Sequence, residues 1–203
     1  TKAHSDSEAA DGHFIEFQDS FTATPTLLHS LVSDYNQNFS TSSAYNVTAG
    51  SFFAMVEIGE ATTTNRSEYL GWIAVTANTT GTNYGRKYET GFKKDGSTDG
   101  VDDTAHVITY DQSFSSTPII IASGNSLNGL DGYWARGSGT HDEDYHGVYA
   151  EEADNGEQTH ADEEISFWAF SGVHNISALT IPFPSASWEH VKLYIWGAND
   201  TYI

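Results

Sequence analysis

Apolar and polar residues alternate along short stretches of this chain. The alternation is clear in FIEF (14–17), VITY (107–110), YLGWIAV (69–75) and ISFWAF (165–170). A period of two residues places successive side chains on opposite faces of a strand, and Gly, Asn and Asp separate these stretches as they do at turns. No stretch sustains the apolar spacing of a helix over a helix length. The pattern therefore predicts an all-β protein of antiparallel sheets.

The pattern also occurs twice. When the chain is shifted by 93 residues, HFIEFQDSFTATPTLLHS (13–30) lies over HVITYDQSFSSTPIIIAS (106–123), with seven of eighteen residues identical. Further on, EYLGWIAV (68–75) lies over EEISFWAF (163–170). Similarity at a fixed shift indicates a duplicated structural unit.

A third pair of segments sets the extent of the two copies. SFFAMVE (51–57) is matched with GVYAEEA (147–153) between the two blocks above. We therefore predict two tandem antiparallel β-sandwich modules of about six strands each, residues 1–84 and 85–203.

Each copy carries a characteristic order of residues. In the second copy these are Phe114, Pro118, Tyr149, Glu151, Glu152, His160, Glu163, Trp168 and Ala169. In the first copy they are Phe21, Pro25, Phe53, Glu57, Glu68, Trp72 and Ala74, with Asn65 or Thr64 where the second copy has His160. Over the greater part of each copy, this order resembles the H-type lectin domain, a six-stranded sandwich, and related bacterial modules with an acidic ending. The resemblance implies binding of N-acetylgalactosamine at subunit interfaces through loop histidine, arginine and aromatic residues.

The C-terminal segment 177–203 has no counterpart in the first copy. It contains two strand-like runs, which we expect to complete or bridge the sandwiches. The opening segment 1–13 is polar, and a strand lent to a neighbouring subunit would hold it in place.

The amino-acid composition limits the classes of partner that we expect for the chain. The chain has 28 acidic and 8 basic side chains, a formal net charge of −20 and no cysteine. Nucleic acids and anionic membranes need a basic surface, so we expect neither as a partner. No run approaches the roughly 20 apolar residues of a membrane span, so we expect no membrane insertion. The absence of cysteine excludes disulfides and thiolate metal sites.

Asparagine sequons suggest the compartment. Six occur, where roughly two or three would arise by chance in a chain this rich in Ser and Thr, at Asn38, Asn46, Asn65, Asn78, Asn175 and Asn199. They favour a secreted or cell-surface glycoprotein over the alternative, a Ser/Thr-rich β surface that contains sequons incidentally.

An acidic segment, DGSTDGVDDTAH (95–106), resembles the head of a calcium loop. Hard oxygen ligands at alternate positions followed by a glycine suit calcium, here Asp95, Ser97 and Asp99, then the Val101 carbonyl and Asp103. His106 replaces the glutamate that ends an EF-hand loop, so this is not an EF-hand. The alternative is an acidic linker between the copies.

A second acidic cluster lies in the hairpin between residues 147 and 170. A strand, loop and strand would bring Glu152 or Asp154 near His160 and Glu163. Either calcium or a structural carboxylate–histidine pair would offset the repulsion there. The alternative is a solvated hairpin tip, because runs of charge usually face water.

A third group is a candidate carbohydrate site. Tyr133, Trp134 and Arg136 combine aromatic faces with a guanidinium, which suits stacking on sugars, and His141 and His146 follow in the next loop. These histidines, with neighbouring aspartates, are alternatively zinc or calcium ligands. The other alternative is core packing: alternation places Tyr133 and Ala135 on one face of a strand, with Trp134 and Arg136 on the opposite face.

The motifs of the common enzyme classes do not occur. The sequence contains no G-x-S-x-G, H-E-x-x-H, phosphate-binding or dinucleotide-binding motif. We therefore expect a non-enzymatic protein: a calcium-stiffened, glycosylated structural subunit of an extracellular filament or sheath, joined to its own copies by strand or interdomain contacts. The alternative is a lectin for galactose-type sugars. A third, weaker hypothesis is a glycoside-active enzyme that uses a pair of carboxylates.

Overall fold

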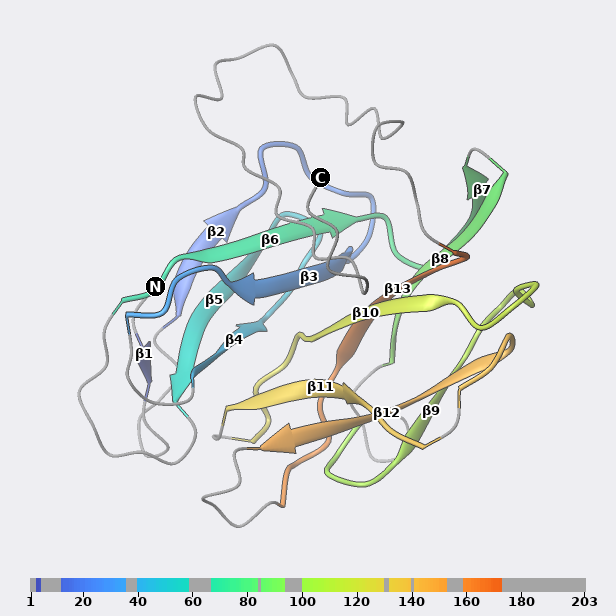
Figure 1. Cartoon of the computed structure of the whole chain (residues 1–203). Helices are drawn as coiled ribbons and strands as arrows, with labels where there is room; N and C mark the ends of the chain where they lie inside the picture. Colours follow the sequence, from blue (N-terminus) through green and yellow to red (C-terminus); the bar gives the residue numbers. More distant parts are fainter. Residues whose placement is uncertain are drawn as a thin grey trace.

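The computed structural model describes residues 3–4, 12–35, 40–58, 67–83, 85–93, 100–129, 132–139, 141–152 and 159–172. Over these residues the protein is all-β, as predicted, and has no helix (Figure 1). The strands are β1 (Ala3–His4), β2 (His13–Glu16), β3 (Thr26–Leu31), β4 (Ser40–Tyr45), β5 (Ser51–Ile58), β6 (Leu70–Val75), β7 (Thr79–Asn83), β8 (Arg86–Lys93), β9 (His106–Thr109), β10 (Ile119–Gly124), β11 (Tyr133–Gly137), β12 (Tyr145–Glu152) and β13 (Ile165–Phe170).

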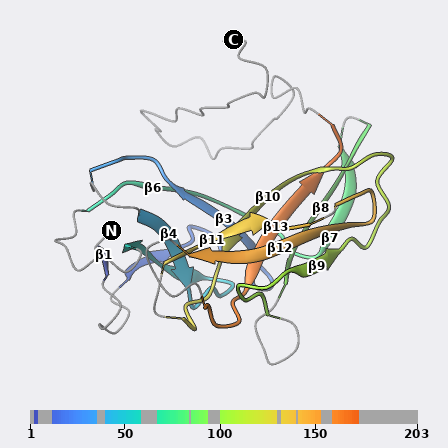
Figure 2. The same cartoon turned by 60° about the horizontal axis from the view of Figure 1, so that its bottom comes forward.

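Strands β2 to β6, here called the first half, and strands β9 to β13, the second half, pair in the same order. In the first half β5 pairs antiparallel with β2 and β4, while β3 pairs with β6. In the second half β12 pairs antiparallel with β9 and β11, while β10 pairs with β13. Figure 2 shows β11, β12 and β9 side by side along one face of the second half.

The ladder registers correct one of the sequence matches. His13 lies opposite Ala54, and its equivalent His106 lies opposite Val148. Ser51 therefore corresponds to Tyr145 and not to Gly147, so the match between β5 and β12 was wrong by two residues. A shift of two residues leaves every side chain on the same face of its strand, which is why alternation alone did not detect the error.

The turns next to these strands also repeat. The Phe17 N–H donates to Gly50 O at 2.8 Å, and the Tyr110 N–H donates to Asp144 O at 2.9 Å. Phe17 meets the ring of Phe21 edge-on at 5.2 Å, and Tyr110 meets Phe114 edge-on at 5.1 Å. Equivalent positions thus make equivalent contacts in both halves.

Each half has its own apolar core between two sheets. The buried residues of the first core are Phe17, Leu27, Ala44, Phe52 and Ala54. Those of the second core are Val101, Ile108, Tyr110, Phe114, Tyr133, Val148, Ala150, Ile165, Phe167 and Ala169. The fold is therefore sandwich-like in both halves.

The hairpin of β7 and β8 belongs to a sheet of the second half. β7 pairs with β8, and β8 pairs with β13, so the sheet order is β10-β13-β8-β7. The module boundary expected between residues 84 and 85 falls in the connection between β7 and β8. Both strands lie on the same side of any boundary that respects the sheets, because a ladder joins them.

The halves meet where the outer edge of β3 rests on side chains of β10 and β13. The N–H groups of Leu27 and His29 donate to Ser166 Oγ at 3.4 Å and to Ser123 Oγ at 3.1 Å. Asn125 Nδ2 donates to Leu27 O at 2.9 Å. These side chains replace a neighbouring strand, so the edge of β3 is satisfied without a further ladder.

The side chain of His29 fastens the same contact. Its Nε2–H donates to Gly124 O at 2.7 Å, and its Nδ1 accepts from Ser42 Oγ at 2.8 Å. This assignment of the two ring nitrogens follows from the carbonyl, which only accepts. Burial lowers the pKa of His29 from 6.5 to about 4, against the opposing effect of the Gly124 carbonyl. The contact between the halves therefore contains a neutral histidine.

The N-terminal strand is held within its own chain. Ala3 and His4 of β1 pair in parallel with Val56 and Glu57 of β5. The part of segment 1–13 that forms β1 therefore needs no neighbouring subunit to order it. None of the described residues forms a helix that is long and apolar enough to cross a membrane.

Candidate functional site

A histidine lies between two carboxylates inside the second half. Glu152 ends β12, while His160 and Glu163 lie on the segment that leads into β13. His160 Nδ1 is 2.6 Å from Glu152 Oε1, and its Nε2 is 3.2 Å from Glu163 Oε1. No more than 3% of any of the three side chains is exposed. The predicted hairpin was wrong, because β12 and β13 lie in different sheets and do not pair. The connection between them nevertheless brings Glu152, His160 and Glu163 together, away from water.

The Glu163 carboxylate has further donors. It accepts the N–H groups of Asn128 and Gly129 at 2.8 and 2.7 Å, and the Ser126 hydroxyl. Its backbone makes a reciprocal bridge with Val101 at 3.0 Å in each direction. Burial of a carboxylate is costly unless its oxygens are hydrogen-bonded, and here they are.

The surroundings of His160 favour its protonated form. Burial pushes its pKa down, but the hydrogen bonds and charges of Glu163 and Glu152 outweigh burial and raise the pKa above the usual value. Of the two explanations offered for the acidic hairpin, the geometry favours a carboxylate–histidine group over a cation. Asp154, the fourth residue predicted there, lies outside the described residues.

The first half keeps part of this arrangement. Ser33 donates to Glu68, as Ser126 donates to Glu163. The N–H of the next residue returns to the serine oxygen in both cases, at 2.7 and 2.6 Å. A part-buried Ser–Glu pair is therefore common to the two halves. The histidine contact described above belongs to the second half.

Part of the predicted calcium loop can be placed. Asp95, Ser97 and Asp99 lie outside the described residues, and Val101 is buried with its N–H and carbonyl bonded to Glu163. Asp103 Oδ1 accepts the N–H of His160 at 3.1 Å. Val101 and Asp103 thus have structural partners within the protein.

A different trio meets beside that loop. One ligand atom from each of Asp102, His106 and Asp162 lies within 4.8 Å of the others. Neither aspartate was predicted, because the bridge from Val101 to Glu163 that brings them together leaves no signal in the sequence.

Asp102 is already well supplied with donors. Its Oδ1 accepts from Thr104 N and Oγ1 at 2.7 and 2.6 Å, and lies 2.7 Å from His106 Nε2. These contacts, above all the Thr104 hydroxyl, lower its pKa to about 2. These hydrogen bonds form a local turn in which the Asp102 side chain accepts the backbone N–H two residues later.

The predicted carbohydrate residues do not gather at one surface. Tyr133 is 3% exposed and donates its hydroxyl to Ser126 O at 3.1 Å, so it is a core residue and not a sugar platform. On the opposite face, Arg136 Nε contacts Glu151 Oε2 at 2.8 Å, and Trp134 is half-buried. The alternation that separated Tyr133 from Arg136 is confirmed.

The two predicted histidines also differ in exposure. His141 is exposed, but His146 is buried in β12, with the two rings 5.0 Å apart. Burial, with the nearby His141, lowers the pKa of His146. A buried neutral ring is poorly placed to bind a sugar from solution.

Two sequons lie on described residues. Asn46 and Asn78 are exposed, with φ angles of 50° and 51°. Asparagine tolerates this left-handed conformation in turns, so both side chains project from turns into solvent. Asn38, Asn65, Asn175 and Asn199 lie outside the described residues.

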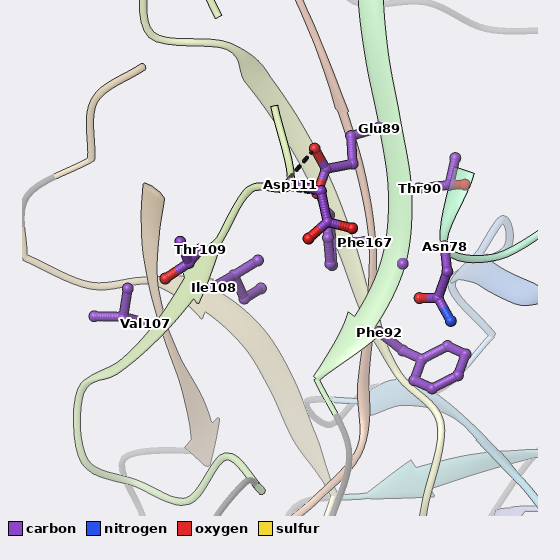
Figure 3. A pocket seen from close by; sticks show the side chains of 10 residues that line it. Asn78, Glu89, Thr90, Phe92, Val107, Ile108, Thr109, Asp111 and Phe167 are labelled. Atoms are coloured by element: carbon purple, nitrogen blue, oxygen red, sulfur yellow. Dashed lines mark hydrogen bonds between the residues drawn. The ribbon is translucent and has the colours of Figure 1, made fainter. Parts of the chain in front are cut away.

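A pocket of about 420 Å³ opens between β8 and β9 (Figure 3). Its buried carboxylate, Glu89, accepts the N–H of Asp111 at 2.9 and 3.1 Å and that of Gln112 at 3.3 Å. Burial raises the pKa of Glu89, although these N–H groups oppose the rise. Glu89 thereby holds the turn after β9 against β8, which is a structural task.

Exposed apolar side chains gather in the first half. Large hydrophobic residues that are exposed there include Val32, Tyr35, Tyr69, Trp72 and Ile73, on or beside β3 and β6. Trp72 is 40% exposed although its ring packs at 5.7 Å from Phe17 and 5.3 Å from Phe52 in the core. Trp72 and Ile73 lie on opposite faces of β6 because successive residues of a strand alternate. Exposed apolar residues at such a strand are candidates for a contact surface.

No protein-family model matches the chain, and no curated protein or solved structure is significantly similar to it.

Proposed function

We propose that the protein is a non-enzymatic structural subunit of an extracellular filament or sheath, in which copies join through the exposed side of β6. One observation carries the proposal: Trp72 is turned toward the core of the first half, yet 40% of it is exposed. Burying a large aromatic side chain contributes about 1.5–3 kcal/mol. A second chain that covers Trp72 would gain the part of this free energy that belongs to the 40% still exposed.

The fold component of the proposal is a pair of tandem sandwiches. We infer that the two halves descend from one H-type lectin-like module. The identical pairing order, the equivalent turn hydrogen bonds and the repeated Ser–Glu pair support this inference. A duplicated unit whose two copies differ at one edge is suited to polymerisation, because one copy remains available for contact.

The extracellular component rests on chemistry at the surface. Asn46 and Asn78 present their sequons to solvent, and a net charge of −20 disfavours nucleic acid and anionic lipid. Attached glycans at Asn46 and Asn78 would leave the outer face of β6 free, because neither residue lies on that strand.

The non-catalytic component rests on the buried acids. His160 with its two glutamates is closed to substrate, and Glu89 is held by backbone N–H groups. A general acid or base must reach the proton that it transfers. The carboxylates with perturbed surroundings thus serve the fold.

The test is association measured by sedimentation velocity and electron microscopy on the purified chain. We compare Ile73→Lys with Val107→Lys, because both residues are 49% exposed but Val107 lies on β9. A lysine on an edge strand opposes association. We expect concentration-dependent polymers in the parent chain and in Val107→Lys, with Ile73→Lys at least ten times weaker. A parent chain that remains a small monodisperse species at every concentration would refute the proposal.

A further inference from the structure

The equivalent strands β6 and β13 differ in their neighbours. β13 has β10 on one side and β8 on the other. β6 has β3 on one side, and its other side has no strand among the described residues. The first half is therefore one strand short of the second at this position.

The backbone of β6 is oriented to receive a strand. The Val32 N–H donates to Tyr69 O, which extends the β3–β6 ladder. Since backbone groups alternate between the two edges of a strand, Ile73 faces β3, while Leu70, Trp72 and Ala74 direct their N–H and carbonyl groups outward. The outward groups have the spacing of an unoccupied antiparallel ladder.

The exposure of the core-facing side chains of β6 and β13 also indicates an open edge on β6. Trp72 of β6 is equivalent to Phe167 of β13, and the exposed fractions are 40% and 5%. Phe167 is covered by β8, so closely that a Cβ added at Gly91 would lie 2.9 Å from its ring. The exposure of Trp72 is thus the exposure expected where the counterpart of β8 is missing.

The chain contains a segment suited to this position. Residues 191–195, Val-Lys-Leu-Tyr-Ile, alternate as a strand does and have no counterpart in the first half. With Val191, Leu193 and Ile195 on the core side, antiparallel pairing sets Leu193 opposite Trp72 and Lys192 opposite Ile73. Alternation on a two-residue period makes this the register that covers the core with aliphatic side chains.

Charge favours delivery of the segment to another copy. Residues 173–203 carry two acidic side chains and one lysine, so almost all of the net charge of −20 lies in the rest of the chain. Two such bodies repel at close range. The nearly neutral segment is the part that approaches a neighbour at least cost. The 18 residues that precede Val191, 173–190, would span up to about 60 Å if extended.

We propose that residues 191–195 of one copy pair with β6 of the next copy and complete its first half. This inference rests on the proposed function, since it names the contact by which the subunits polymerise. The contact is strand addition, in which main-chain hydrogen bonds supply affinity and alternate side chains supply specificity.

Engineered disulfides test the proposal, because the chain has no cysteine of its own. Full chains carrying only Ile73→Cys are mixed with full chains carrying only Lys192→Cys under mild oxidation. In the proposed register these positions form a non-hydrogen-bonded pair, where Cβ atoms are closest and a disulfide fits. The control replaces Ile73→Cys by Val107→Cys, which is equally exposed.

We expect a disulfide-linked heterodimer between the Ile73→Cys and Lys192→Cys chains, at least ten times more abundant than with Val107→Cys. In the double variant Ile73→Cys, Lys192→Cys, we expect a ladder of linked oligomers on a non-reducing gel. Equal linking to Val107→Cys, or only intrachain linking in the double variant, would overturn the proposal.

A second measurement separates this contact from assembly itself. Leu193→Asp places a charge opposite Trp72 and should weaken polymerisation at least tenfold in sedimentation experiments, whereas Thr201→Asp, later in the same segment, should leave it unchanged. Polymers that form normally in Leu193→Asp would overturn the strand addition and leave the structural function standing. Absence of polymers in every variant, the parent included, would remove both.

Discussion

The two halves of the molecule pair their strands in the same order but close their cores differently. In the second half β13 lies between two strands, and Ile165, Phe167 and Ala169 are almost fully buried. In the first half the equivalent strand, β6, has one neighbour among the strands that the structure describes, and Trp72 and Ile73 are exposed. The two halves thus share a ladder pattern, whereas burial depends on which strand lies at each edge.

The largest expected effect is on the stability of the two cores. Phe167→Ala should lower the free energy of unfolding by about 3–5 kcal/mol, as for a fully buried aromatic residue. Trp72→Ala in dilute, unassociated protein should cost about 2 kcal/mol, because much of its side chain already contacts water. Denaturant unfolding with unchanged m-values measures both. Equal losses would show that the first half needs no further strand.

The next effect concerns the contact that joins the halves. Because the pKa of His29 is lowered to about 4 in the folded protein, its contribution to stability is complete above 6.5 and is lost as the pH falls from 6.5 toward 4. The free energy of unfolding should fall by on the order of 2 kcal/mol. A shift of one pKa unit corresponds to about 1.36 kcal/mol, and solvent reduces the effect because the His29 side chain is partly exposed.

His29→Gln tests this by removing the titration. It should flatten the stability profile between pH 4 and 6.5 relative to the parent chain, measured by chemical denaturation at each pH. A parent profile that is already flat in this window, or a variant profile as steep as the parent's, would contradict the role given to His29.

A smaller effect, with the opposite dependence of stability on pH, is expected from His160 in the second half. The pKa of His160 is raised, so its contribution is complete below 6.5 and is lost as the pH rises through the raised value. We expect the free energy of unfolding to decrease as the pH rises above neutral. His160→Gln, compared with the exposed His141→Gln, should abolish this alkaline loss. NMR titration of the His160 ring showing a pKa below 6.5 would contradict the assignment.

The smallest expected effect concerns calcium. If the acidic segment 95–106 binds calcium, the ion stabilises the native state by mass action, and chelation lowers the melting temperature by a few degrees. Asp99→Asn should reduce this difference, and Asp19→Asn should not. A melting temperature that is unaltered by chelator would remove calcium from the account.

Much of the fold could be predicted because strand periodicity is local. Alternation in residues 69–75 and 165–170 predicted strands that the structure contains as β6 and β13. The sequence repeat coincides with turns that make equivalent contacts in both halves. The two-residue slip in β5 was not detectable, since it exchanges positions that share a face.

The candidate sites were harder to predict because they depend on long-range contacts. The group of Glu152, His160 and Glu163 was found because the three residues are close in sequence, at the end of β12 and in the connection to β13. The meeting of Asp102 with Asp162, by contrast, depends on a bridge between distant segments.

The contact between the halves left no pattern in the sequence either. Ser123, Asn125 and Ser166 close the edge of β3, but small polar residues on strands are ordinary at exposed positions. These three residues acquire their role only because the edge of β3 lies against the sheet that contains β10 and β13.

The most direct test of the account is amide hydrogen exchange in β6. Leu70, Trp72 and Ala74 direct their N–H groups away from β3, so their exchange reports on a strand added at the open edge. We predict fast exchange of these three amides in dilute protein and strong protection in the assembled material, while the Phe167 amide is protected in both. Protection that is the same before and after assembly would contradict the claim that copies join through β6.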